Sequence, residues 1–182
     1  MLCFPILYLG GSLAAAGLTL IAKWILVGRY RPGEKPLWST VVWRNELLNA
    51  LHEHLAEPFL VGALTGTPFV CWYFRLLGAR IGRRVYLETT DFSEFDLVRL
   101  GDEAALNADC TIQTHLFEDR VMKMSTIHIA PRCKIGAGSL VLYDTRMEAG
   151  ASLGDLSLLM KGEVLPAWTS WEGIPARTTD SN

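Results

Sequence analysis

Cysteine and histidine are scarce in the chain, and neither is arranged for cross-linking or metal binding. The four cysteines stand far apart at Cys3, Cys71, Cys110 and Cys133, without a CxxC pair. This spacing disfavours both a disulfide framework and a zinc site. Reduced thiols in a domain that faces the cytoplasm are the simpler interpretation, and we expect no bound metal.

An excess of basic charge is also missing. The 17 lysine and arginine residues are outweighed by 19 aspartate and glutamate residues, which gives a net charge of −2. No positive field therefore favours nucleic acid as a partner. Half of the residues are hydrophobic and the mean hydropathy is +0.22. This composition is unusually apolar for a soluble domain and indicates contact with a membrane.

The N-terminal segment has almost no charge. Residues 4–28 contain one charged side chain, Lys23, near their end. About 20 apolar residues at 1.5 Å each cross a bilayer core of roughly 30 Å, so we expect residues 1–30 to form a transmembrane helix. Lys23 would reach the headgroups and Trp24 the interface, and the basic residues that follow would keep the remaining chain on the cytoplasmic side. A helix buried against another domain is the alternative.

Residues 31–80 are expected to form amphipathic or interfacial helices. The second apolar stretch, 57–79, is interrupted by proline and glycine and favours a kinked helix that lies on the membrane or caps the next domain. The preceding residues 43–55 have apolar positions at helical spacing. His52 and His54 point to different sides of that helix, which predicts two solvated or interfacial histidines rather than a metal site.

A period of six residues governs the second half of the chain. Neither a helix nor a strand keeps this period, whereas the hexapeptide repeat of a parallel β-helix does. Upstream, the same frame appears in two pieces that are separated by one inserted residue between Leu87 and Leu100. The large apolar positions of the uninterrupted run are Ile129, Ile135, Val141, Met147, Leu153, Leu159, Leu165 and Trp171.

This repeat predicts a mainly β fold, a left-handed parallel β-helix preceded by α-helices. We expect a domain over residues 81–176 with roughly four coils, followed by a disordered tail at 177–182. The large residues would fill the interior, and the small residue four positions later would fit the corner. Cys110 and Cys133 fall on small positions, which predicts buried thiols rather than nucleophiles.

One unit of the repeat is interrupted around a histidine. Seventeen residues separate Ile112 from Ile129, which leaves an eleven-residue insertion from Glu118 to His128 after one hexapeptide. Such an insertion is expected on the surface, projecting from one corner of the prism. His115 would lie at its foot, on the exposed side of the strand that begins at Ile112.

The segments Trp43–Gly82 and Phe92–Lys123 resemble the membrane-embedded region of poly-amino-acid synthetases such as ε-poly-L-lysine synthetase. The stretch "WEGIPAR", Trp171–Arg177, is similar to the turn that ends the β-helix in hexapeptide acyltransferases. The synthetases resemble nonribosomal peptide synthetases, with membrane helices that alternate with three tandem acyltransferase-like domains. The resemblance implies one such domain, and formation of an amide bond from an aminoacyl thioester.

The resemblance also implies a role for His115 as general base. An imidazole whose pKa is about 6.5 can take the proton of an attacking amine or hydroxyl. The alternative is a surface histidine that holds the insertion by a hydrogen bond. In sugar-directed relatives, an asparagine placed like Asn107 contacts the acceptor, although a hydrogen bond at a strand corner explains it equally well.

Two further groups of residues are candidates for substrate binding. Glu118 and Asp119 could orient His115 or bind a cationic, amino-acid or polyamine-like acceptor, or they could be solvated charges. Gly136, Gly138 and Ser139 offer a flat edge that could pair with the amides of a phosphopantetheine arm, from a carrier protein or coenzyme A. Tight packing between coils would also explain these glycines.

Two classes of function stay open at this stage. One is an acyltransferase, either the amide-forming enzyme or an acyl-CoA-dependent O- or N-acetyltransferase. The other is a noncatalytic module that anchors a synthetase to the membrane and trimerises it. In both cases we expect three prisms about a threefold axis, as a homotrimer or as three tandem domains.

Overall fold

The computed structural model describes residues 3–179, and helices form its first part. The first helix, α1, continues as a short π-helix. The second, α2, continues as a longer π-helix that contains Pro58, and a single 3-10 turn follows it. A short strand, β1, lies between them. These elements are α1 (Cys3–Ala22), η1 (Lys23–Val27), β1 (Gly33–Pro36), α2 (Thr40–Leu51), η2 (His52–Val61), η3 (Gly62–Leu64) and α3 (Pro68–Leu77).

The second part is a prism of three parallel sheets whose strands follow one another around its axis. The first sheet has the order β15-β12-β9-β4-β2, with β2 (Arg80–Ile81), β4 (Val98–Leu100), β9 (Ile127–Ile129), β12 (Arg146–Met147) and β15 (Val164–Leu165). The second has the order β16-β13-β10-β5-β3, with β3 (Tyr86–Leu87), β5 (Ala105–Leu106), β10 (Lys134–Ile135), β13 (Ser152–Leu153) and β16 (Ser170–Glu172). The third consists of β6 (Thr111–Gln113), β11 (Leu140–Leu142) and β14 (Leu158–Leu159), and a single bridge to Ile112 adds Phe92 to it. This is the parallel β-helix that the six-residue period predicts.

The interior of the prism is built from the predicted apolar positions. Partner residues in the first sheet form a column of Ile81, Leu100, Ile129, Met147 and Leu165. The second sheet stacks Leu87, Leu106, Ile135, Leu153 and Trp171 in the same way. Most of these side chains are fully buried, so each coil seals the apolar face of the coil before it.

The corners of the prism repeat with the same period. A left-handed backbone conformation, with φ between 51° and 78°, recurs at every sixth residue from Arg132 to Trp168. Glycine takes this conformation without strain, yet the chain also places Leu156 and Trp168 there. The next residue is small and buried in the first five of these corners, as expected for Cys133, and the thiol of Cys110 is likewise buried.

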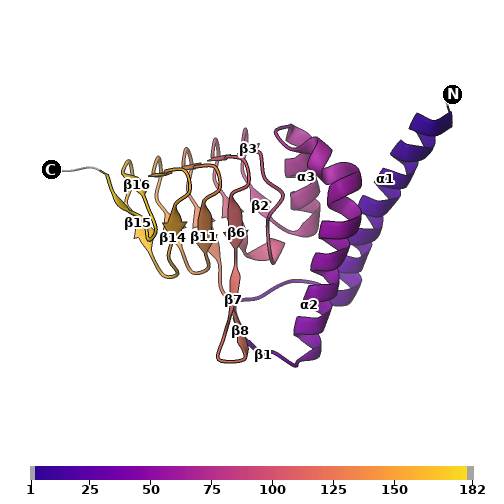
Figure 1. Ribbon diagram of the computed structural model, residues 1–182, viewed down its shortest axis with the longest axis horizontal. Helices are drawn as coiled ribbons and strands as arrows, with labels where there is room; N and C mark the ends of the chain where they lie inside the picture. The colour runs from indigo at the N-terminus through magenta and orange to yellow at the C-terminus, as the bar shows by residue number, and fades with distance from the viewer. Residues whose placement is uncertain (1–2, 180–182) are drawn as a thin grey trace.

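The helices are stacked on the end of the prism where its first strands lie, and the C-terminus is at the opposite end (Figure 1). The ring of Phe74 on α3 packs against Phe92 and Phe95, with ring centroids 4.5 Å and 5.8 Å away. The 3-10 turn η4 (Phe95–Leu97) stands where the sequence predicts an inserted residue. The second apolar stretch therefore caps the β-helix, one of the two arrangements expected for it.

Two polar side chains of the helices are buried, contrary to expectation. Lys23 does not reach outward, because its Nζ lies 2.8 Å from Asp96 Oδ2 and its side chain is fully buried. His52 is also buried, with Nδ1 3.2 Å from the hydroxyl of Tyr73, and burial lowers its pKa. Both side chains fasten the helices to the first coil instead of meeting solvent or lipid.

The first helix keeps the properties of a membrane segment. The helical segment Pro5–Val27 is long and apolar enough to cross a bilayer, and only 22% of its apolar 18-residue stretch is buried against the rest of the protein. At the other end of the chain, Arg177 and Thr178 form strand β17, which pairs antiparallel with β16, so the tail is ordered at these two residues. The rest of the expected tail, from 180 to 182, lies outside the described residues.

The insertion is a hairpin and not an irregular loop. Strands β7 (His115–Glu118) and β8 (Val121–Met124) pair antiparallel, and β1 from the N-terminal part adds a third strand on β8 (Figure 1). Asp119 and Arg120 both have positive φ, as a two-residue turn between twisted strands requires. The hairpin projects from the corner between β6 and β9, which agrees with the expected surface insertion.

Replacement of Gly136 by alanine is expected to destabilise the prism by about 3 kcal/mol. A Cβ atom there would lie 2.4 Å from the backbone nitrogen of Asp155 in the next coil, and backbone cannot move aside as a flexible side chain can. Thermal or urea unfolding of the detergent-solubilised chain measures the change. Gly17→Ala is the control, because its Cβ meets nothing within 4 Å in helix α1. Equal stability of the two variants would contradict the close approach of the coils.

Candidate active site

A buried carboxylate holds the histidine at the foot of the hairpin. His115 Nδ1 lies 2.8 Å from Glu94 Oε2. The side chain of Glu94 is fully buried, and that of His115 is 11% exposed. A carboxylate in this position accepts the hydrogen of Nδ1, which leaves Nε2 as the basic nitrogen of the neutral imidazole.

Glu94 reaches this position through the irregular corner of the first coil. It follows the bridge residue Phe92 and immediately precedes the 3-10 turn η4. Its own φ of 33° lies in the left-handed region, which is unusual for a glutamate. The inserted corner thus turns a carboxylate inward at the one place where the hairpin leaves the prism.

The carboxylate of Glu94 is satisfied by three donors, two at the base of the hairpin and one on helix α2. Besides His115, it accepts a hydrogen bond from Thr114 Oγ1 at 2.5 Å and one from Asn45 Nδ2, on helix α2, at 3.0 Å. The amide oxygen of Asn45 in turn accepts from the hydroxyl of Tyr30 at 2.6 Å. A fully bonded network of this kind fixes both the position of the carboxylate and the ring orientation of the histidine.

The charge of Glu94 sets the basicity of His115. Burial alone would lower the pKa of the imidazole, but the hydrogen bond and the negative charge of Glu94 outweigh burial, and the pKa is raised. The exposed carboxylate of Glu46 adds a smaller effect in the same direction. His115 is therefore a stronger base than a free imidazole.

The second nitrogen of His115 lies beside Phe117, whose ring borders a cleft. Nε2 has no partner in the part of the chain that the structure describes, and it is not among the fully buried polar atoms that lack one. The ring of Phe117 lies edge-on to the imidazole, with centroids 5.3 Å apart. Phe117 also borders a cleft of about 280 Å³, whose other lining residues are Leu37, Trp38, Val42, Trp43 and Glu46.

The placement of His115 differs from the expectation in two respects. It is the first residue of the hairpin and is mostly buried, whereas the exposed side of the preceding strand was expected. Its partner is Glu94, and neither Glu118 nor Asp119 orients it. Glu118 binds Lys161 from a later coil and lies 3.1 Å from Lys123, and Asp119 stands in the hairpin turn.

The expected donor and acceptor residues meet at a different corner. Asn107 lies in the turn that precedes β6, and Gly136–Ser139 lie in the equivalent turn of the next coil, where Gly138 N donates to Ala108 O. His115 follows the far end of β6, so the structure brings Asn107 close to the glycines and not to the histidine.

The glycine edge is less open than expected. The backbone N–H groups of Gly136 and Gly138 donate to carbonyls of neighbouring coils, and Ala137 N donates to Asp155 Oδ1. The hydroxyl of Ser139 is buried and donates to Gly154 O. Close packing between coils therefore explains the glycines, and the N–H groups of residues 136–138 already have acceptors within this prism.

Sequence reasoning missed the residues that support the histidine. Glu94, Asn45 and Tyr30 carry no repeat signal, and Glu94 is 21 positions away from His115 in the chain. The only available signal was the extra residue between Leu87 and Leu100, which marks an irregular corner one coil before the hairpin. Among residues 3–179, no three His, Cys, Asp or Glu side chains are grouped so that they could hold a metal ion.

The chain is similar in sequence to part of a poly-amino-acid synthetase. It is 43% identical over 173 residues to the delta-poly-L-ornithine synthetase of Acinetobacter baumannii (strain AB307-0294), a match that covers 93% of this chain and 13% of the synthetase. The chain thus spans a small part of that relative's length. No protein-family model matches it.

The fold has several known counterparts. A maltose O-acetyltransferase from Clostridium difficile 630 superposes with a TM-score of 0.52 at 14% identity, over 65% of this chain and 80% of that one. A hexapeptide-repeat acetyltransferase from Vibrio cholerae, complexed with acetyl coenzyme A, also gives 0.52 at 14% identity, over 66% and 82%. The chain is thus a relative of part of a poly-amino-acid synthetase, and it has the fold of the hexapeptide-repeat acetyltransferases.

Proposed function

We propose that the chain is an acyltransferase domain that joins an acyl or aminoacyl thioester to an amine acceptor, with His115 as the general base. The observation that carries the proposal is the buried Glu94–His115 pair, in which Glu94 fixes one imidazole nitrogen while the other has no partner among residues 3–179. Acyl transfer to an amine needs this arrangement, because a proton must leave the nitrogen as it attacks. The relationship to a poly-ornithine synthetase supports an amide-forming reaction.

The chemistry assigned to the pair is one proton transfer in each direction. His115 Nε2 takes a proton from the acceptor amine while Glu94 stabilises the positive charge that develops on the ring. The amine nitrogen bonds to the thioester carbonyl carbon, the carbon–sulfur bond breaks, and the proton on His115 passes to the departing thiolate. Glu94 stays ionised throughout, so the protein returns to its starting state.

The cleft beside His115 suits a cationic acceptor. Trp38, Trp43 and Phe117 expose 77%, 62% and 45% of their surface there, and the carboxylate of Glu46 lies among them. Aromatic faces and a carboxylate attract an ammonium group by cation–π and charge interactions. We therefore transfer the acceptor role from Glu118 and Asp119 to Glu46 and these aromatic residues.

The donor site is proposed to need a second prism. A thioester arm, from coenzyme A or a carrier protein, must bring its carbonyl to Nε2 of His115. The corner at Asn107, Gly136 and Gly138 lies beyond the length of strand β6 from that atom, so it can take part only from a neighbouring copy. We therefore propose that the prisms are arranged as a trimer or as tandem domains. We also retain as proposals the left-handed coil, the anchoring of α1 in the membrane and the cytoplasmic side for the β-helix domain.

The rate of acyl transfer is expected to rise with pH through a single ionisation whose midpoint lies above 6.5. His115 must be neutral to act as a base, and Glu94 raises its pKa, so the active form accumulates at higher pH than for a free imidazole. The measurement is kcat between pH 5.5 and 9, with a pantetheine thioester and ornithine as the probe substrates. A rate that is flat across this range would remove His115 from the chemistry.

A further inference from the structure

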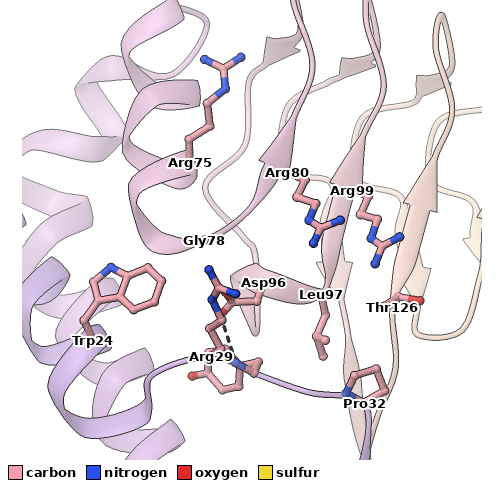
Figure 2. Close-up of a pocket in the computed structure, with 11 residues that line it drawn as sticks. Trp24, Arg29, Pro32, Arg75, Gly78, Arg80, Asp96, Leu97, Arg99 and Thr126 are labelled. Carbon is pink, nitrogen blue, oxygen red and sulfur yellow. Dashed lines mark hydrogen bonds between the residues drawn. The ribbon is translucent and has the colours of Figure 1, made fainter.

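A second cavity lies on the other side of the Glu94 network, between the helices and the prism. Its volume is about 490 Å³, and η1, the residues after it and the end of α3 form one wall while strands β2 and β4 form the other (Figure 2). Four arginines line it: Arg29, Arg75, Arg80 and Arg99. One acidic side chain, Asp96, is also present.

The positive charge of this cavity is not neutralised by the chain. Asp96 is already bound to Lys23 Nζ at 2.8 Å and to the backbone N–H of Tyr30 at 3.1 Å. Arg75 is held at the margin, where its guanidinium donates to the carbonyls of Ile81 and Gly82. Arg29, Arg80 and Arg99 have no carboxylate partner among residues 3–179, so three guanidinium groups stay available.

The strand register extends this charge along one face of the prism. Arg80 pairs with Arg99 in the next coil, Arg99 with His128, and His128 with Arg146. Like charges on directly opposed positions destabilise a sheet, and Arg80 and Arg99 form such a pair on the first two strands of this face. A smaller, adjoining cavity of about 280 Å³ continues along this face and shares Arg99 and Thr126 with the arginine-lined one.

One polar atom of a residue that lines the adjoining cavity also lacks a hydrogen-bond partner. His128 Nδ1 is buried and has no hydrogen-bond partner among the described residues. Burial and the neighbouring charges of Arg146 and Arg99 lower the pKa of His128. Arg146 is bound to Glu148 and Asp144 lines this cavity, so the positive charge without a carboxylate partner lies at Arg29, Arg80 and Arg99 of the first cavity.

We propose that this arginine-lined cavity binds a phosphate or pyrophosphate group. Guanidinium groups match the oxygens of phosphate in pairs, and Arg80 and Arg99 lie side by side on neighbouring strands facing Arg29 from the loop after α1 (Figure 2). The binding face requires the helical layer, because Trp24, Arg29 and Arg75 complete the cavity that the coils alone leave open. The proposal does not use His115, so it can fail or hold independently of the general-base role.

Two kinds of molecule carry a phosphate group that this cavity would recognise. Trp24 lies at the end of the apolar helix, and Phe69, Trp72 and Leu76 form an exposed apolar stripe on α3, which suits a phospholipid headgroup. A phosphate of coenzyme A or of phosphopantetheine would be recognised by the same guanidinium groups.

The test is calorimetric binding of inorganic pyrophosphate to the detergent-solubilised full chain at low ionic strength. We expect the double variant Arg80→Gln, Arg99→Gln to raise the pyrophosphate Kd at least tenfold. The control is Arg83→Gln, Arg177→Gln, which removes two exposed arginines outside both cavities and should leave the Kd unchanged. Without ligand, the first double variant should melt no lower than the wild type, since it relieves repulsion.

Competition then separates the sources. Dioctanoyl phosphatidylglycerol, with the phosphatidylcholine analogue as its control, and coenzyme A are each titrated against bound pyrophosphate. The compound that displaces pyrophosphate at the lower concentration is the source, and displacement by neither leaves a site for free phosphate. Failure of pyrophosphate to bind the wild type, an unchanged Kd in the first double variant, or an equal loss in the control variant would overturn the proposal.

Discussion

Replacement of His115 by alanine is expected to lower the rate of acyl transfer by about 10²–10⁴-fold, the range that a positioned general base contributes. The loss should appear in kcat, because the imidazole acts on the attacking nitrogen in the transition state and contributes little to holding the substrates. The measurement is steady-state release of free thiol from a pantetheine thioester, with ornithine as acceptor.

A matched control separates catalysis from folding in this experiment. His128→Ala removes the other histidine of the repeat region, at a position that does not contact Glu94. It should keep most of the activity. If His115→Ala retains more than about a tenth of the wild-type rate while its melting temperature is unchanged, the general-base role fails, and the noncatalytic membrane-anchoring module becomes the better account.

Replacement of Glu94 by glutamine is expected to lower the rate by about 10²-fold or more, as loss of the orienting carboxylate does in other imidazole-based acyl transfers. The variant keeps the size of the buried side chain but removes the negative charge that raises the pKa of His115. Burial then remains as the main influence, so the pKa of His115 should fall below its ordinary value. The midpoint of the pH–rate profile should move to lower pH together with the loss of rate.

The same variant has a predicted signature in stability. In the wild type the folded-state pKa of His115 is raised, so its contribution to stability is complete below pH 6.5 and is lost as pH rises through the folded-state value. In Glu94→Gln the burial of His115 opposes protonation instead. The difference in free energy of unfolding between the two proteins should therefore grow as pH falls from 8.5 to 6, as urea unfolding can measure. A difference that is constant with pH would contradict the ion pair.

The architecture of the prism is readable from the sequence because one short rule repeats. Each column of the interior requires a large apolar residue at a fixed place in every coil, and Ile129 through Leu165 supply it without exception. The corners of the prism show the limit of what the repeat reveals. The left-handed position is equally periodic, but Arg132, Leu156 and Trp168 occupy it as well as glycine, so composition alone does not reveal it.

The support of the active site could not be predicted in the same way. Glu94, Thr114 and Asn45 meet through an irregular corner, a hairpin base and a helix, and none of these contacts follows from a local period. A glutamate in a loop is ordinarily solvated, so its burial depends entirely on three donors from distant elements. His115 was found from the break in the repeat, whereas its partner became visible only in three dimensions.

A buried ion pair also explains why Lys23 lies inside the protein and not at the membrane surface that the sequence predicts. Lysine at the end of an apolar helix commonly extends toward lipid headgroups, and Lys23 was expected to do so. The turn η4 instead offers Asp96, which compensates the buried ammonium group and ties the end of α1 to the first coil. The partner that decides this placement is 73 residues away in the sequence.

The central claim is that His115, held by Glu94, transfers an acyl group to an amine. The most direct measurement is mass spectrometry of the product after a single turnover, with an isotopically labelled aminoacyl pantetheine thioester and ornithine as acceptor. We predict a labelled amide with the wild type and with His128→Ala, and none above background with His115→Ala. An equal yield of amide from His115→Ala, or only the hydrolysed amino acid from all three proteins, would contradict the claim.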